Sequence, residues 1–404
     1  MMQNGSTKDD NWQIKSSQAA LATSATARWM ASAKKSKSTD ESVPSKSTIT
    51  LSIGELLPPT EARAAIVDAI QESSAHGYAI SYGNSITRQA VAEFLSDSNL
   101  KFTIDDIIMT SGCNQAIETC FTCLADPGDN ILIPRSSFSL FDSLCAAGHI
   151  EPRFYNLRPD KGWEIDFEDL KKKHRRANTS CSHQQSIKSM WHYEIYAGMT
   201  FEGVKFHATA TLSERVPVLT CGGISKLFCC PGWRCGWIAI HDPMNYLFDS
   251  VRPCLFDLSV RLLGPNSIIQ AALPRILNET PKIYFKDYMA YVQKNAELMF
   301  DILSQAQPTI EPHKSQGALY MLIRINPDQF DGTIENEIDF AKKLMDEQAV
   351  SCVPCTSFGI SNYCRLVTVA PFENVRDACE RIVEFCHKYQ KKSNGHTHNN
   401  NNTE

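Results

Sequence analysis

The sequence predicts an α/β protein with two domains, a large α/β/α domain built on a parallel sheet and a smaller α+β domain. Three observations lead to this fold class. Strand-like and helix-like segments alternate between residues 107 and 241, which is typical of parallel sheets with right-handed crossovers. Helical patterns then dominate from residue 268 to residue 304, before short strand and helix patterns resume. Finally, 404 residues with 43% hydrophobic content can bury two cores.

Apolar periodicity and turn residues locate the elements of the first half of the chain. The Pro58-Pro59 pair is a helix-opening signal, and Asp126-Pro-Gly-Asp129 is a turn signal. Helices are expected at residues 60–73, 86–96 and 115–124. Strands are expected at residues 49–53, 107–110, 130–134, 216–221 and 236–241. Between them, a basic run at 171–176 is followed by a polar stretch at 177–190 that has no strand pattern.

The second half predicts the elements of the smaller domain. Pro274 and Pro281 mark breaks in the helical region 268–304. Beyond it, strands are expected at 318–325, 349–354 and 363–369, and helices at 335–347 and 373–389. The expected domains are a small one, 47–75 with 266–391, and a large one, 76–265.

Both ends of the chain are polar. We expect a disordered leader at 1–46, with room for a short helix near 19–33, and a disordered tail at 392–404. Asp9, Asp10, Asp40 and Glu41 argue against a transit peptide, which is acid-poor, so a cytoplasmic location is expected.

The composition of the chain limits which classes of binding partner are expected. A net charge of -5 gives no reason to expect nucleic acid or an anionic membrane surface, and no apolar run is long enough to span a bilayer. The 15 cysteines are scattered and odd in number, which favours free thiols in a reducing compartment. The C-x-x-C pairs Cys120/Cys123 and Cys352/Cys355 lack accompanying histidines, so core thiols are a better interpretation than a metal site.

One stretch, residues 221–237, carries the most chemical information. Lys226 stands among apolar and small residues, where burial disfavours the charged ammonium and leaves a nucleophilic amine. Arg234 offers a planar fork that suits a phosphate. Together they suggest pyridoxal phosphate, with its aldehyde on Lys226 as a Schiff base and its phosphate on Arg234. A buried strand-turn-strand with one snorkelling lysine is the alternative.

The motif Ser225-Lys226, followed by Pro231-Gly-Trp-Arg-Cys-Gly-Trp237, resembles the lysine signature of fold-type I aminotransferases. The resemblance is greatest to the tyrosine and nicotianamine aminotransferases and runs, with gaps, from about Ile49 to Lys388. It implies a fold-type I pyridoxal-phosphate transferase that acts on an amino acid and a 2-oxo acid, with an aromatic amino acid as donor. It also implies a homodimer whose sites lie at the subunit interface.

A phosphate site is expected where a strand leads into a helix. Gly112, Cys113 and Asn114 open that helix, and their free N–H groups form a ready anion site, although a plain strand-helix turn looks the same. The resemblance adds Arg234 and a tyrosine from the partner subunit, matched by Tyr78. An ordinary loop aromatic is the alternative for Tyr78.

The other site residues are carried over from the resemblance. Phe138 would stack on the pyridine ring, and Tyr196 would hydrogen-bond the cofactor's 3'-oxygen; a core phenylalanine and a strand tyrosine are the alternatives. Ser225, next to Lys226, is included among the cofactor-binding residues. Arg365 precedes an apolar strand and would bind the substrate α-carboxylate in a bidentate fashion, with a structural ion pair as the alternative.

The chain also departs from the family pattern. It has no Asn-Pro-x-x-Asn-Pro-type loop, and Tyr193 stands where a carboxylate pairs with the pyridine nitrogen. Residues 170–195 are too few and too polar for a full strand-helix-strand unit. Gly223 and Leu227 replace the family's frequent Ser and Arg. Three hypotheses follow: a working aminotransferase, a carbon-sulfur lyase of the same family, or a non-catalytic homologue.

Overall fold

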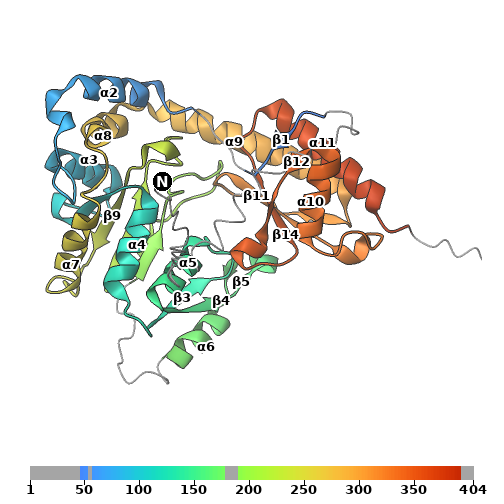
Figure 1. Ribbon diagram of the computed structural model, residues 1–404, viewed down its shortest axis with the longest axis horizontal. Helices are drawn as coiled ribbons and strands as arrows, with labels where there is room; N and C mark the ends of the chain where they lie inside the picture. The colour runs from blue at the N-terminus through green and yellow to red at the C-terminus, as the bar shows by residue number, and fades with distance from the viewer. Residues whose placement is uncertain (1–45, 53–56, 178–189, 393–404) are drawn as a thin grey trace, which may run out of the picture.

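The computed structural model describes residues 46–52, 57–177 and 190–392 of the chain. Residues 60–279 form the larger lobe and residues 304–390 form the smaller one, and α9 (Lys282–Leu303) runs between them (Figure 1). The leader and tail predicted from the sequence lie outside the described residues except for Lys46 and Lys392. The predicted helix near residues 19–33 lies wholly outside them.

The larger lobe is built on a four-stranded sheet in the order β2-β9-β8-β7. Its strands are β2 (Ile107–Thr110), β9 (Gly236–His241), β8 (Val218–Gly223) and β7 (Met190–Tyr193). The sheet is mixed rather than all-parallel, because β9 runs antiparallel to both β2 and β8, whereas β7 and β8 are parallel. Apolar runs show where buried strands lie but not which way they run, so the direction of β9 could not be predicted.

A second, separate parallel pair joins β3 (Asn130–Pro134) to β4 (Glu151–Tyr155). Within the described residues β7 is therefore the edge of the larger sheet, and β3 is not hydrogen-bonded to it. The stretch expected to be too short for a strand-helix-strand unit, residues 170–195, contains this edge strand.

Alternation along the strands explains why helices cover both faces of the larger sheet. Met109, Trp237 and Ala239 face a core shared with α2 (Thr60–Gln71), α3 (Ser85–Leu95) and α8 (Ser267–Glu279). Ile108 and Ile238 face the opposite core, which is shared with α4 (Cys113–Leu124), α5 (Leu140–Gly148) and α7 (Val251–Leu258).

Pro274 was expected to break the helical region, and this expectation is wrong, because α8 continues through it. A proline has no N–H, so it leaves the carbonyl of Gln270 without its helical donor. The hydroxyl of Thr87 in α3 donates to that oxygen at 2.9 Å, which satisfies it from a neighbouring helix. Pro281, in contrast, is the N-cap of α9 and does separate two helices.

The smaller lobe holds an antiparallel sheet in the order β10-β11-β14-β13. The strands are β10 (Ile310–Pro312), β11 (Tyr320–Ile325), β14 (Tyr363–Val367) and β13 (Val353–Pro354). Helices α9, α10 (Glu337–Gln348) and α11 (Phe372–Tyr389) pack with this sheet in one core. β1 (Ile49–Thr50) pairs in parallel with β12 (Val350–Ser351), which ties the start of the described chain to this lobe.

The domain boundaries stay a prediction. They assign α2 and α8 to the smaller domain, but both helices share their buried residues with α3 and the larger sheet. Between the lobes a short hairpin, β5 (Leu157–Arg158) and β6 (Glu164–Ile165), precedes α6 (Phe167–Ala177).

Candidate active site

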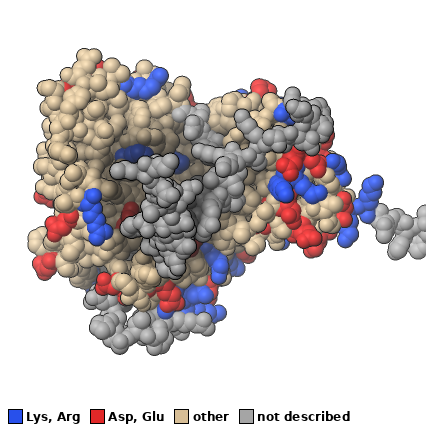
Figure 2. Space-filling model, in the orientation of Figure 1, with Lys and Arg blue, Asp and Glu red and all other residues tan. Residues whose placement is uncertain are grey.

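A cavity of about 1140 Å³ lies where the two lobes meet. Figure 2 shows a hollow on this face, with Lys or Arg atoms visible inside it. The cavity brings together eight of the ten site residues predicted from the sequence: Cys113, Asn114, Phe138, Tyr196, Ser225, Lys226, Arg234 and Arg365. Gly112 adjoins the cavity through Arg234, whereas Tyr78 does not line it.

The anion corner is formed by the turn into α4 and by Arg234. Gly112 has φ +80° and precedes the first residue of the helix, whose opening N–H groups point outward without intrahelical acceptors. The Arg234 guanidinium donates from Nη1 to the Pro231 carbonyl at 2.8 Å and from Nη2 to the Ser111 carbonyl at 3.4 Å. An arginine fork and a helix N-terminus therefore converge in one place, an arrangement that suits a phosphate.

Two glycines permit this convergence. A Cβ on Gly112 would lie 2.4 Å from Arg234 Nη2, so any larger residue would displace the guanidinium. A Cβ on Gly236 would lie 2.7 Å from the backbone nitrogen of Cys113, so β9 can begin against the start of α4 only without a side chain there.

Lys226 lies in the turn that follows β8 and is half-buried, while Ser225 beside it is buried. Among the described residues, Lys226 forms no ion pair with any aspartate or glutamate. An unpaired amine in a cavity is available to react with a carbonyl compound.

The aromatic side of the cavity is centred on Tyr193, at the end of β7. Its ring lies nearly parallel to Phe138, with centroids 6.2 Å apart and an interplanar angle of 14°. Burial raises the pKa of Tyr193, so its phenol is neutral at physiological pH. Phe138 lines the cavity with its ring stacked on Tyr193, and its predicted role against a pyridine ring stays a prediction.

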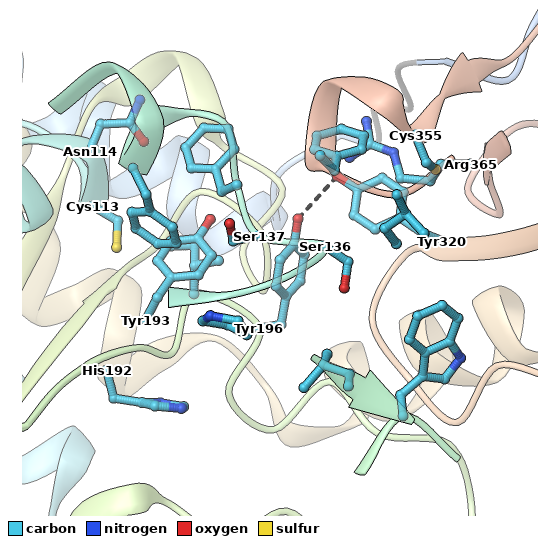
Figure 3. Close-up of a pocket in the computed structure, with 18 of the residues that line it drawn as sticks. Cys113, Asn114, Ser136, Ser137, His192, Tyr193, Tyr196, Tyr320, Cys355 and Arg365 are labelled. Carbon is cyan, nitrogen blue, oxygen red and sulfur yellow. Dashed lines mark hydrogen bonds between the residues drawn. The ribbon is translucent and has the colours of Figure 1, made fainter. Parts of the chain in front are cut away.

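Tyr196 lies in the turn after β7 and donates its hydroxyl hydrogen to Tyr320 Oη at 3.0 Å. Figure 3 shows this hydrogen bond bridging the side of the cavity that carries Tyr193 and the side that carries Arg365. Burial, together with Tyr320, raises the pKa of Tyr196, which keeps its phenol protonated and able to donate.

Arg365 lies on β14 and stacks between two rings. Its guanidinium carbon is 4.3 Å from the centroid of Tyr320 and 4.8 Å from that of Phe358. Its buried Nε has no hydrogen-bond partner among the described residues, and no carboxylate there pairs with it. These contacts favour the interpretation that Arg365 receives a ligand anion over that of a structural ion pair.

The charged side chains that line the described cavity are all positive. Its described lining holds three cations, Lys226, Arg234 and Arg365, and no aspartate or glutamate. The nearest acid in sequence to Tyr193 is Glu194, which is turned away: it accepts from the Thr209 N–H at 2.7 Å and pairs with His192 Nδ1 at 3.3 Å. The described cavity lining around Tyr193 therefore offers no carboxylate that could pair with a ring nitrogen.

Sequence reasoning missed Tyr320, Phe358 and Trp163, which line the cavity from positions far apart in the chain. Nothing local to their sequence marks them, because they come from separate segments: Tyr320 lies on β11 beside β14, Phe358 in the turn after β13, and Trp163 on the β5–β6 hairpin. Tyr78 is 95% exposed, so in a single chain it contacts no site, and its proposed role toward a partner subunit stays a prediction.

Two arginine-lined anion positions and an amine in one cavity define a class: a two-lobed α/β protein built for an anionic carbonyl compound and a carboxylate. The family model for aminotransferases of class I and II matches residues 46–192 and 191–382. The chain belongs to this family, and the match is divided where the sequence predicts a missing segment. The family is one of pyridoxal-phosphate enzymes, so pyridoxal 5'-phosphate is the cofactor.

Individual relatives and solved structures support the same family. The chain is 37% identical over 382 residues to the tyrosine aminotransferase of Mus musculus, covering 87% of this chain and 84% of the relative. It is 32% identical over 364 residues to an S-alkyl-thiohydroximate lyase of Arabidopsis thaliana, covering 83% of this chain and 78% of the relative. The solved tyrosine aminotransferase of Leishmania infantum superimposes with a TM-score of 0.83 at 28% identity, covering 94% of this chain and 99% of that one. These likenesses confirm the fold-type I class predicted from the sequence.

The residues present fit the cofactor at two of its ends. The anion corner suits its phosphate, and Lys226 suits its aldehyde. The sequence matches Tyr193, a neutral phenol, to the position of the acid expected at the ring nitrogen, and its place there stays a prediction. Among the described residues, no helix is long and apolar enough to cross a membrane, and no cluster of His, Cys, Asp and Glu could hold a metal ion.

Proposed function

We propose that the chain transfers the amino group of an aromatic amino acid to a 2-oxo acid. The observation that carries this proposal is the single cavity in which Lys226, Arg234 and Arg365 meet without an acidic residue among the described lining. The relative from Mus musculus is a tyrosine aminotransferase. The rings of Tyr320, Phe358 and Trp163 in the same cavity suit an aromatic side chain.

Bound pyridoxal phosphate supplies an aldehyde that condenses with amines and a ring that withdraws electrons from the substrate Cα. Arg234 and the first N–H groups of α4 would bind the phosphate, and Lys226 Nζ would hold the aldehyde. The Lys226 amine, when free, would accept the proton from the substrate Cα. Arg365 binds the carboxylate and thereby orients the Cα–H bond.

A carbon-sulfur lyase is the second candidate, favoured by Tyr193. A neutral phenol would give the ring nitrogen no counter-charge, so the cofactor would withdraw electrons less strongly, and loss of a β-sulfur group from the substrate would compete with transamination. The relative from Arabidopsis thaliana with that activity shows that the family includes lyases. A non-catalytic homologue is the third hypothesis.

One assay separates the three. Purified protein with pyridoxal phosphate is given tyrosine and 2-oxoglutarate, and formation of the aromatic oxo acid is followed; in parallel it is given an S-alkylcysteine, and thiol release is followed. Oxo acid formed by wild type and not by Lys226→Ala supports the transaminase. Thiol release alone favours the lyase, and neither product favours the non-catalytic homologue.

We further propose a cytoplasmic homodimer. Tyr78, Ile80, Leu262 and Leu263 are exposed, and a Cβ on Gly264 would lie 2.6 Å from the Ser81 carbonyl, so the two segments adjoin in one apolar surface. A second copy of the chain would cover it. Analytical ultracentrifugation tests this: a monomer at micromolar concentration contradicts the dimer, and a tagged chain followed in cells tests the location.

A further inference from the structure

The β5–β6 hairpin carries an unusual residue at its tip. Trp163 has φ +67°, directly after Gly162 with φ +65°, and its N–H donates to the Arg158 carbonyl at 2.9 Å. A left-handed backbone is unfavourable for a residue with a Cβ, and it turns the indole out of the hairpin. The hairpin base is fixed to α6, because the Asn156 N–H donates to Asp169 Oδ2 at 2.8 Å.

The indole of Trp163 lies against two rings of the other lobe. Its centroid is 5.8 Å from His313 and 5.7 Å from Tyr363, both in edge-on geometry, and those two rings are 5.6 Å apart. Gly162 and Glu164 on either side of Trp163 are exposed, whereas Trp163 is half-buried. Burial lowers the pKa of His313, which favours the neutral ring that such packing requires. The cluster is therefore an aromatic contact between the lobes.

This contact lies next to Arg365. Tyr363 and Arg365 are two residues apart on β14, so their side chains lie on the same face of the strand. His313 is also linked to Arg365 through the neighbouring strand. Its N–H donates to the Leu322 carbonyl at 2.8 Å, and Leu322 is the residue on β11 that pairs with Arg365. Trp163, Leu322 and Arg365 all line the cavity. Figure 1 places the hairpin beside β14, at the junction of the lobes.

We propose that Trp163 is the positioning residue that holds the two lobes together over the bound carboxylate and keeps the face of β14 that carries Arg365 in place. The inference rests on the proposed function, because it takes Arg365 as the carboxylate site. Trp163 acts through Tyr363 and His313 and does not contact the reacting atoms. The ligand class it serves is a carboxylate with an aromatic side chain, whose ring would lie beside the indole.

The test uses 3-(4-hydroxyphenyl)propionate, a carboxylate with the substrate's aromatic ring and no amine, and isothermal titration calorimetry on the full chain with added pyridoxal phosphate. Wild type should bind it, and Arg365→Ala should not. Trp163→Ala should weaken binding about 10-fold, whereas Trp163→Phe, which keeps a ring, should stay within about 3-fold of wild type. Ile165→Ala is the matched control, since Ile165 is 38% exposed on the same hairpin and outside the cavity lining, and it should bind as wild type does.

Steady-state kinetics provide the second measurement. Trp163→Ala should raise KM for the amino acid by a similar factor and change kcat little, because the indole holds the lobes and does not move a proton. Equal losses in Trp163→Ala and Trp163→Phe, or unchanged binding in both, would overturn the inference. If wild type binds the ligand no better than Arg365→Ala does, the proposed function fails, and the role of Trp163 fails with it.

Discussion

The guanidinium of Arg234 lies against the Cα of Gly112, so closely that a Cβ at residue 112 would stand 2.4 Å from Nη2. This contact joins the two halves of the anion corner, one from the turn before α4 and one from the turn before β9. Gly112 is therefore required for two reasons: its φ is +80°, and a side chain there would collide with Arg234.

Gly112→Ala should therefore weaken pyridoxal phosphate binding by at least about 10-fold, because Arg234 must leave the phosphate position. Fluorescence titration with the cofactor measures the change. The matched control is Gly128→Ala, where φ is +94° but a Cβ would meet nothing within 4 Å. That variant also places a Cβ on a residue with positive φ and should keep wild-type affinity. Equal losses in both variants would mean that strain, rather than the Arg234 contact, explains the effect.

Tyr193→Asp should raise turnover, by about 10-fold or more, because a carboxylate beside the pyridine nitrogen strengthens the electron sink. The variant loses the ring contacts with Phe138, Phe141 and Tyr196, so the cofactor-free protein should melt at a lower temperature than wild type. Tyr193→Phe keeps the ring and should give no gain in rate. An unchanged rate in Tyr193→Asp would show that residue 193 does not face the ring nitrogen.

Arg365→Lys should raise KM for the amino acid by about 10- to 100-fold, because an ammonium keeps the charge but loses the bidentate fork and the stacking on Tyr320 and Phe358. Initial-rate kinetics over a range of tyrosine concentrations measure it. Arg324→Lys is the control, since Arg324 pairs with Glu311 at 3.7 Å on the exposed side of β11. A KM that is equal in both variants would remove Arg365 from the carboxylate site.

Glu194 gives the protein a pH-dependent stability. Burial alone would raise the pKa of Glu194, but hydrogen bonds from His192 and from Thr209 outweigh it and lower the pKa. A lowered folded-state pKa adds stability above the unfolded value of about 4.3, and this stability is lost as pH falls through the folded value. Glu194→Gln should lower the free energy of unfolding by about 1–3 kcal/mol at pH 7. Urea unfolding at pH 7 and below pH 4 should show the difference shrinking, and a difference that stays constant with pH would contradict this account.

The sequence predicted strands of the larger lobe where apolar runs are bounded by turn residues. The strands at 107–110, 130–134 and 236–241 have the bounds that were expected. It could not predict that α8 passes through Pro274, because the compensating hydroxyl of Thr87 lies 183 residues from Gln270 in the chain. Local propensity governs the first kind of feature, and tertiary contact governs the second.

The site divides in the same way. Lys226 and Arg234 were identifiable because a lone lysine and an arginine follow a buried strand in a specific motif. The other rings of the cavity were not, because Tyr320 and Phe358 come from other segments of the smaller lobe and Trp163 from the β5–β6 hairpin, so only tertiary packing unites them. The role of Phe138 against a pyridine ring stays a prediction, and its ring stacks on Tyr193, where the sequence departs from its family.

The central claim is that Lys226 reacts with pyridoxal phosphate in this cavity, and the visible absorption spectrum of the purified protein with added cofactor tests it most directly. Wild type should show a band from the bond between Lys226 Nζ and the cofactor aldehyde. Lys226→Ala should lack this band, and Lys205→Ala, which changes an exposed lysine outside the cavity lining, should keep it. Sodium borohydride should fix the cofactor to wild type at Lys226, as peptide mass spectrometry would show. A spectrum at saturating cofactor without the band, or with a band that survives in Lys226→Ala, would contradict the account.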